Sequence, residues 1–275
     1  MPVLGCGKAS HVTALLLVVV TLLGLLAGSF LTTVVDRVPS GQSVVRPRSR
    51  CRTCGHPVRN RHNIPVVGWV VLKGRCADCG TRTGLHNPLL EAGTAALFIA
   101  ITRRLADGPL LSALPAYLYF AALGIALSVI DLEHHRLPDA LVLPAYPVLA
   151  VLLTASSAAR HDWSSLGRAA VGAVVLFGCY LALALVHPRG MGFGDVKLAG
   201  VVGGALAYLS WSALVVGALG AFVLGAVTGV AMMAAGRAGR TTAIPFGPFM
   251  IVGAVTAMFA AGPIAEVYLA LLRAV

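Results

Sequence analysis

The stretch VTALLLVVVTLLGLLAGSFLTTVV, residues 12–35, decides the fold, because it contains no charged side chain. About 20 consecutive apolar residues form a helix long enough to cross the hydrocarbon core of a bilayer. The whole chain has the same character: of its 275 residues 58% are hydrophobic and 11% charged, with a mean hydropathy of +0.87. Soluble domains carry about a quarter charged residues. The composition therefore excludes a soluble domain and predicts a chain embedded in the lipid bilayer.

Further apolar stretches follow along the chain, and together they predict eight transmembrane helices. The expected spans are 12–35, 88–106, 113–131, 140–156, 167–186, 196–210, 212–235 and 248–271. Glycine is abundant within them, as in helices that pack closely in lipid. The predicted fold class is all-α and polytopic, with a first helix in 1–35, a polar insert in 36–87 and a seven-helix membrane block in 88–275. A secretory signal peptide is the alternative for the N-terminus, but its apolar core would be shorter.

The formal charge of +11 is concentrated in the insert. Ten of the 21 Lys and Arg residues lie within 36–86, where Asp36 and Asp78 are the only acids. Alternating spans then place fifteen basic residues on the side of the insert and six on the other side, and basic residues prefer the cytoplasmic side. The insert is therefore expected in the cytoplasm, beside anionic lipid headgroups. No nucleic-acid partner is expected, because no stacking aromatic residues accompany the basic run.

Four of the six cysteines form two pairs that are separated by 21 residues, and each pair is followed at once by a glycine. A turn after the second thiolate favours positive φ, which glycine adopts without steric cost. Four thiolates suit tetrahedral Zn²⁺, and a reducing cytosol favours metal over disulfides. The alternatives are His56 or His62 in place of one cysteine, or two disulfides if the insert faces outward. The prediction is a structural Zn²⁺ held by Cys51, Cys54, Cys76 and Cys79.

Two acids stand at expected helix ends on the side of the insert. Asp131 ends the third span in VIDLEHHRLPD (129–139), and Asp195 opens the sixth in GMGFGDVKL (190–198). A carboxylate within a span is costly, so it indicates a functional site unless a partner explains it. Two close carboxylates share one proton, so one can activate water while the other donates to the substrate. The glycines before Asp195 permit an unwound backbone that a substrate can approach. This pattern predicts an aspartic peptidase.

Other roles for these acids remain open at this point. Both could be interfacial aspartates at helix ends, or they could form the proton or cation relay of a transporter. Asp139, which follows Leu137-Pro138, is expected to be an ordinary helix N-cap. Glu91 is expected to be a carboxylate favoured by the dipole at the start of its helix.

Five blocks in order resemble the type IV prepilin peptidases, also called leader peptidase/N-methyltransferases, which are intramembrane aspartic peptidases of the GxGD type. The blocks are GSFL (28–31) with RVP (37–39); the cysteine quartet with NIP (63–65) and GRC (74–76); the Asp131 segment with LPD (137–139); GFGDVKL (192–198); and IPFGPF (244–249). The resemblance implies an eight-span enzyme of the bacterial plasma (inner) membrane, with Asp131 and Asp195 as the catalytic pair, facing the cytoplasm together with the insert.

The resemblance also implies the substrates and a second activity. Prepilins or pseudopilins would lose a short basic leader, and the new N-terminus would then be methylated with S-adenosylmethionine as the methyl donor. The presence of the cysteine insert favours the form with both activities. The alternatives are the transporter relay or a non-catalytic platform for pilus assembly.

Overall fold

All regular elements among the described residues are helices. The computed structural model describes residues 6–46, 49–51, 53–59, 62–106, 108–186, 191–237, 239 and 244–273. The elements are α1 (Cys6–Arg37), η1 (Val38–Ser40), α2 (Val67–Val71), α3 (His86–Ala106), η3 (Pro109–Ala113), α4 (Leu114–His134), α5 (Asp139–Arg160), α6 (Trp163–Val186), α7 (Phe193–Leu209), α8 (Trp211–Ala234) and α9 (Gly247–Arg273). Extended pairing in this part of the chain is limited to two isolated bridges in the insert. The all-α prediction is confirmed.

Within the part of the chain that the structure describes, six helical segments are long and apolar enough to cross a membrane, as judged by length and composition. They are Ala14–Ser40, Pro109–His134, Asp139–Arg160, Trp163–Val186, Trp211–Ala234 and Gly247–Val267. The expected spans 88–106 and 196–210 are helical, as α3 and α7, but they are not among the six. Helix α3 carries two arginines in its last turn, and α7 has only 17 residues. The multi-pass prediction is confirmed, and the number eight stays a prediction.

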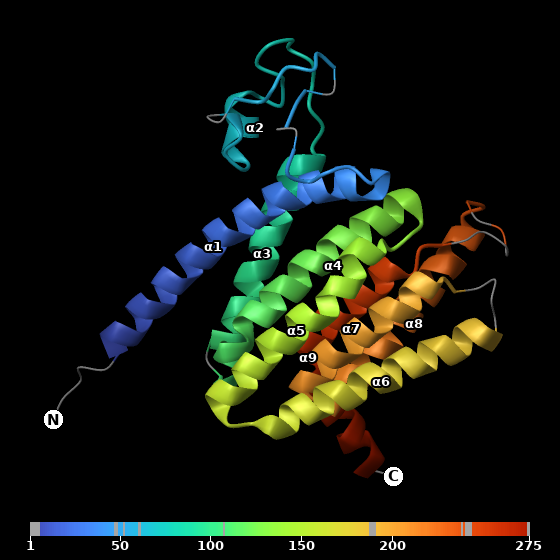
Figure 1. The fold of residues 1–275 in the computed structure, drawn as a ribbon. Coiled ribbons are helices and arrows are strands. Elements are labelled where there is room, and N and C mark those ends of the chain that lie inside the picture. The colour runs from blue at the N-terminus through green and yellow to red at the C-terminus, as the bar shows by residue number, and fades with distance from the viewer. Residues whose placement is uncertain are drawn as a thin grey trace. The chain divides into compact units, whose positions relative to one another are not determined.

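The chain forms two compact units, Met1–Leu114 and Pro115–Val275. In the first unit α1 and α3 run antiparallel, and the insert lies beyond the end of α1 and the start of α3 (Figure 1). Their backbones nearly touch: a Cβ added to Gly24 would lie 2.6 Å from the Cα of Ala95, and one added to Gly28 would lie 2.5 Å from the Cα of Glu91. Glycine at both positions therefore permits the close pairing of these two helices.

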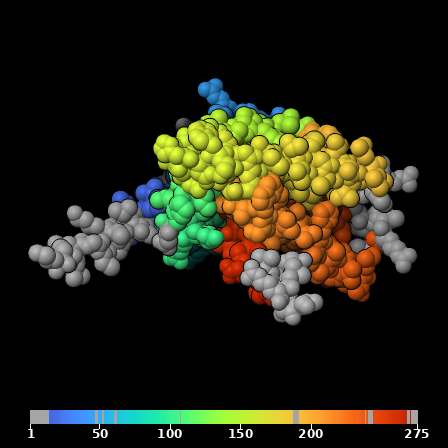
Figure 2. All heavy atoms as spheres, turned by 90° about the horizontal axis from the view of Figure 1, so that it is seen from below, coloured from blue at the N-terminus to red at the C-terminus, as the bar shows by residue number. Residues whose placement is uncertain are grey.

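Helix α7 forms the core of the second unit. Its side chains are buried almost without interruption from Asp195 to Tyr208, and it packs against α5, α6, α8 and α9. The outer helices instead expose apolar side chains such as Val174 of α6 and Val223 of α8, which are 73% and 60% exposed. Figure 2 shows α6 (yellow) and α8 (orange) running across the surface of the molecule. An apolar surface of this kind suits contact with lipid.

Side chains of neighbouring helices hold the C-terminal end of α7. The Nε of Arg168 in α6 donates to the Ala207 carbonyl at 2.5 Å, and its Nη2 donates to the Tyr208 carbonyl at 2.7 Å. The hydroxyl of Tyr117 in α4 donates to the carbonyl of Ala205 at 2.8 Å. The last carbonyls of a helix have no partner within it, so these donors both satisfy and fix that end. The other end of α7 begins after Gly192, its N-cap.

Candidate functional site

Asp131 lies in the last turn of α4, and its carboxylate is held by the start of α9. The side chain is 5% exposed, and the Gly247 N–H donates to its Oδ2 at 3.0 Å. A Cβ on Gly247 would lie 2.8 Å from the same oxygen. Only glycine therefore brings the backbone close enough for this hydrogen bond without displacing the carboxylate.

Asp195 is the third residue of α7 and is 9% exposed. The Gly192 N–H donates to its Oδ2 at 3.2 Å, which closes the first turn of the helix. Gly194 lies between them, and a Cβ there would lie 3.0 Å from the Cβ of Leu137. Gly190, the first glycine of this segment, lies outside the described residues.

The two carboxylates come together around Leu137. This side chain lies 3.2 Å from the Cβ position of Gly247, which binds Asp131, and it also limits the space at Gly194, which precedes Asp195. Asp131 is close enough to Asp195 to act on it electrostatically. The ends of α4, α7 and α9 thus gather two buried acids, each with one oxygen oriented by a backbone N–H.

Asp139 does not cap its helix, contrary to expectation. The N-cap of α5 is Pro138, without a side-chain cap, and Asp139 is the first residue of the helix. Its two oxygens lie 2.7 and 2.8 Å from the Nζ of Lys197, which also stands 5.1 Å from the centre of the Phe193 ring. The nearby lysine charge accounts for this choice of partner. The ion pair joins the start of α5 to the start of α7.

An aromatic cluster lies beside this site, and the sequence did not reveal it. Phe246, directly before Gly247, lies 6.1 Å from the ring of Tyr180 and 5.2 Å from that of Phe222. Tyr180 is close enough to Asp195 to interact with it electrostatically. Rings at these separations pack favourably, so the cluster supports the segment that carries Gly247. The signal in the sequence for this cluster was the Pro-Phe-Gly-Pro run at 245–248. The rings of Tyr180 and Phe222 that contact Phe246 lie on other helices.

The four cysteines of the insert converge as predicted. Their sulfur atoms all lie within 4.8 Å of one another, and the Sγ atoms of Cys51 and Cys79 are 3.8 Å apart. Zn–S bonds of about 2.3 Å in a tetrahedron imply sulfur separations of about 3.8 Å. Both following glycines, Gly55 and Gly80, have positive φ, at 73° and 69°. The described cysteines are free thiols, and the cluster contains neither His56 nor His62. This donor set fits a tetrahedral metal ion.

Backbone amides favour the thiolate form that a metal requires. The N–H groups of Cys54 and Thr53 lower the pKa of Cys51 to about 6. The pKa of Cys79 is also lowered, first by the hydroxyl of Thr81. The His56 backbone lowers the pKa of Cys54, but desolvation and the sulfur atoms of Cys79, Cys51 and Cys76 raise it to about 12. Metal ions bind the deprotonated form of cysteine, so in the metal-free cluster Cys51 and Cys79 favour that form and Cys54 does not.

Glu91 connects the insert to α3. Its Oε2 accepts a hydrogen bond from the Val66 N–H at 2.6 Å, and the side chain is 8% exposed. Val66 stands just before α2 with a φ of 59°, which is rare for a β-branched residue. The expected interaction with the helix dipole is therefore an incomplete account of Glu91, because its carboxylate also fixes a strained turn of the insert.

Comparisons with known proteins agree on one family. The Bacterial Peptidase A24 N-terminal domain matches residues 22–105, which include the four cysteines, and the Type IV leader peptidase family matches residues 118–230, which include both acids. A protein of Pseudomonas aeruginosa named prepilin leader peptidase/N-methyltransferase is 34% identical over 291 residues, 95% of this chain and 96% of the relative. A protein of that name from Burkholderia pseudomallei is 34% identical over 282 residues, 91% and 87% of the two chains.

A third relative of that name is longer than this chain. The protein of Myxococcus xanthus is 39% identical over 223 residues, which are 80% of this chain, and the match spans 64% of the relative. No solved structure matches the chain.

Proposed function

The chain belongs to the type IV leader peptidase family, and we propose that Asp131 and Asp195 are the catalytic pair with which it cleaves prepilin leaders. It is an aspartic peptidase with N-methyltransferase activity and a multi-pass protein of the inner membrane. The names of the relatives favour this function over a transporter relay or an assembly platform. The observation that carries the proposal is the convergence of two buried carboxylates, each oriented by a glycine N–H.

The chemistry follows from the two carboxylates. In both, Oδ2 accepts the backbone N–H, and the hydrogen bonds among the described residues leave Oδ1 for water and substrate. With one proton shared between them, the ionised carboxylate takes a proton from water as the water attacks the peptide carbonyl. The protonated carboxylate donates to the developing oxyanion and later to the leaving amine. The cut removes the leader of a prepilin or pseudopilin after its short basic segment.

The membrane orientation follows from charge. Because the basic insert prefers the cytoplasm, we place the insert and the catalytic pair at the cytoplasmic face. The functional division is then a first helix in 1–35, a metal-binding insert in 36–87 and a catalytic membrane block in 88–275. Cys51, Cys54, Cys76 and Cys79 would hold Zn²⁺ as a structural ion, because a closed four-thiolate site has no open position for water. S-adenosylmethionine supplies the methyl group that the new N-terminal amine accepts.

Asparagine substitutions test the catalytic pair. Asp131→Asn and Asp195→Asn should each reduce leader removal by about 10³-fold or more, because each loses a proton-transfer group. Asp139→Asn is the matched control, since Asp139 is about half exposed and bonds to Lys197, and it should stay within about threefold of the wild-type rate. Cleavage and methylation of a purified prepilin by the full-length enzyme in nanodiscs are followed by mass spectrometry. A correctly folded Asp131 or Asp195 variant that cleaves at the wild-type rate would remove that residue from the catalytic pair.

A further inference from the structure

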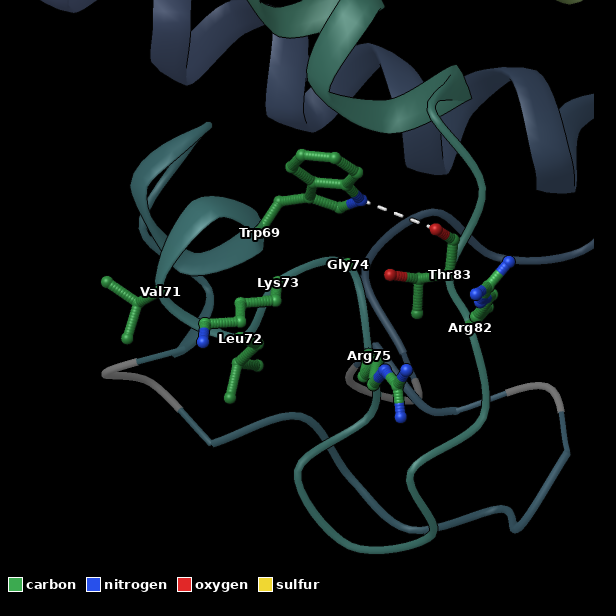
Figure 3. A pocket seen from close by; sticks show the side chains of 8 residues that line it. All are labelled: Trp69, Val71, Leu72, Lys73, Gly74, Arg75, Arg82 and Thr83. Atoms are coloured by element: carbon green, nitrogen blue, oxygen red, sulfur yellow. Dashed lines mark hydrogen bonds between the residues drawn. The ribbon is translucent and has the colours of Figure 1, made fainter.

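A cationic pocket lies in the insert, beside α2. It has a volume of about 610 Å³ and is lined by the ring of Trp69 and by Lys73, Arg75 and Arg82 (Figure 3). Arg75 and Arg82 face each other across an isolated antiparallel bridge. Like charges directly opposite each other on paired strands repel. Among the described residues no carboxylate forms an ion pair with any of the three cations, and the Asp78 carboxylate lies 2.8 Å from Arg59 instead. The pocket therefore favours an anion.

An apolar surface adjoins these cations. Val67, Val70 and Val71 lie on one face of α2, three and four residues apart, and are 51%, 57% and 67% exposed. Ile64, just before the helix, is 51% exposed. Trp69 points away from Val71 (Figure 3) and packs on Gly74, where a Cβ would lie 2.9 Å from its ring. Helix α2 thus turns its partly buried aromatic side chain toward the cationic pocket and presents its aliphatic side chains outward.

The position of α2 brings this surface close to a helix that is able to cross the membrane. Val66, which precedes α2, is bonded to Glu91 of α3, and the backbone of Glu91 touches Gly28 of α1. Gly28 lies within Ala14–Ser40, a segment apolar enough to cross the membrane. The start of α2 is therefore about one glutamate side chain away from α1, a helix that contains a segment able to cross the membrane.

We propose that α2 and this pocket form a membrane-contact site for anionic phospholipids. The apolar face of Ile64, Val67, Val70 and Val71 enters the boundary between headgroups and acyl chains, and Lys73, Arg75 and Arg82 bind the lipid phosphates. S-adenosylmethionine does not fit this pocket, because its sulfonium and ammonium groups outweigh its single carboxylate and would meet three cations. A basic leader segment is repelled for the same reason.

Lipid binding by the full-length enzyme tests this site. The affinity for phosphatidylglycerol is measured by native mass spectrometry, in a background of phosphatidylcholine. Arg75→Gln with Arg82→Gln should weaken binding by roughly 25-fold, since each cation near an anionic surface contributes a factor of about five. The matched control is Arg103→Gln with Arg104→Gln, two exposed arginines at the other end of α3, which should leave the affinity unchanged. Equal losses in both pairs would overturn the assignment.

Two further measurements separate lipid from other sources of phosphate or of negative charge. Inorganic phosphate should fail to displace the lipid, because it gains nothing from the apolar face; displacement would reduce the site to an ion pocket.

Tryptophan fluorescence tests the membrane contact directly. With Trp163→Phe and Trp211→Phe, Trp69 is the only tryptophan left, and brominated acyl chains should quench its fluorescence when phosphatidylglycerol is present. Absence of quenching would overturn the membrane contact, and this result requires no substitution in the pocket itself. Unchanged lipid affinity in the Arg75/Arg82 variant, with a raised KM for prepilin in lipid-free detergent, would assign the pocket to an acidic segment of the substrate.

Discussion

Replacing Gly247 with alanine tests how closely catalysis depends on the orientation of Asp131. The new Cβ would lie 2.8 Å from Oδ2 of Asp131 and 3.2 Å from Cδ2 of Leu137. Ordinary contacts begin near about 3.4 Å, so the carboxylate must move by roughly half an ångström. A misplacement of about 1 Å at a catalytic group can cost about 100-fold in rate. We therefore expect Gly247→Ala to lower kcat by roughly 10- to 100-fold.

The assay must distinguish a displaced carboxylate from an unfolded protein. Cleavage of a purified prepilin gives kcat and KM, and a thermal melt of the same sample in nanodiscs gives Tm. Gly220→Ala in α8 is the matched control, because its Cβ would meet nothing closer than the Gly253 Cα at 3.7 Å. Alanine is favoured over glycine in a helix by about 0.5–1 kcal/mol, so the control should keep its kcat and melt at the same temperature or slightly higher.

One outcome would refute this reasoning. If Gly247→Ala is folded and cleaves within about twofold of the wild-type rate, then the misplacement that produces such losses has not occurred. The hydrogen bond from Gly247 would then serve the start of α9 and would not be needed to orient Asp131 for catalysis.

Three further perturbations address the rest of the chain. Glu91→Leu leaves a buried amide of the insert without its acceptor, at a cost of about 1–3 kcal/mol, so limited proteolysis should cut the insert faster, whereas Glu91→Gln keeps an acceptor and should be mild. Asp162→Ala removes the acceptor at the start of α6 and should lower Tm. The hydroxyls of Ser164 and Ser165 hold the pKa of Asp162 well below its usual range. The stability that the Asp162 carboxylate contributes is therefore present above about pH 4 and is lost as the pH falls further. Thermal melts in a series of acidic buffers would reveal this loss. Serine in place of both cysteines of the first pair should abolish stoichiometric zinc in elemental analysis; retained zinc would contradict the four-thiolate site.

The sequence predicted those features that depend on local chemistry. Long uncharged stretches fix helices in lipid, so the all-α, multi-pass fold was predictable. The limits of this rule appear in α7, an expected span that has only 17 residues and packs against four other helices, and that is not among the six segments able to cross a membrane by length and composition. Asp131 and Asp195 were found because an acid in a span is costly. The convergence of the four cysteines was predictable, because two close pairs that are each followed by a glycine form a typical metal-binding pattern.

The partners of these residues could not be predicted, because tertiary contacts choose them. The hydrogen bond of Asp131 comes from Gly247, 116 positions later. Asp139 was expected to cap α5 from its local preference, but Lys197, 58 positions away, binds it instead. Glu91 stands where a helix dipole favours an acid, yet its bond to Val66 links it to the insert. In each case the residue type was informative, and the contact required the assembled fold.

The capture of the last carbonyls of α7 by Arg168 has a consequence for the proposed catalytic pair at the other end of the helix. Helix α7 also packs along its length against α5, α6, α8 and α9, so a change at that end can reach Asp195 as a small tilt of the whole helix. Asp195 stands about 18 Å along the axis from Ala207, so a pivot of only about 3° would carry its carboxylate by about 1 Å. Arg168 therefore helps to set the tilt of the helix that carries Asp195 near its other end. A small change in these contacts would move the Asp195 carboxylate, although no altered residue would touch a substrate.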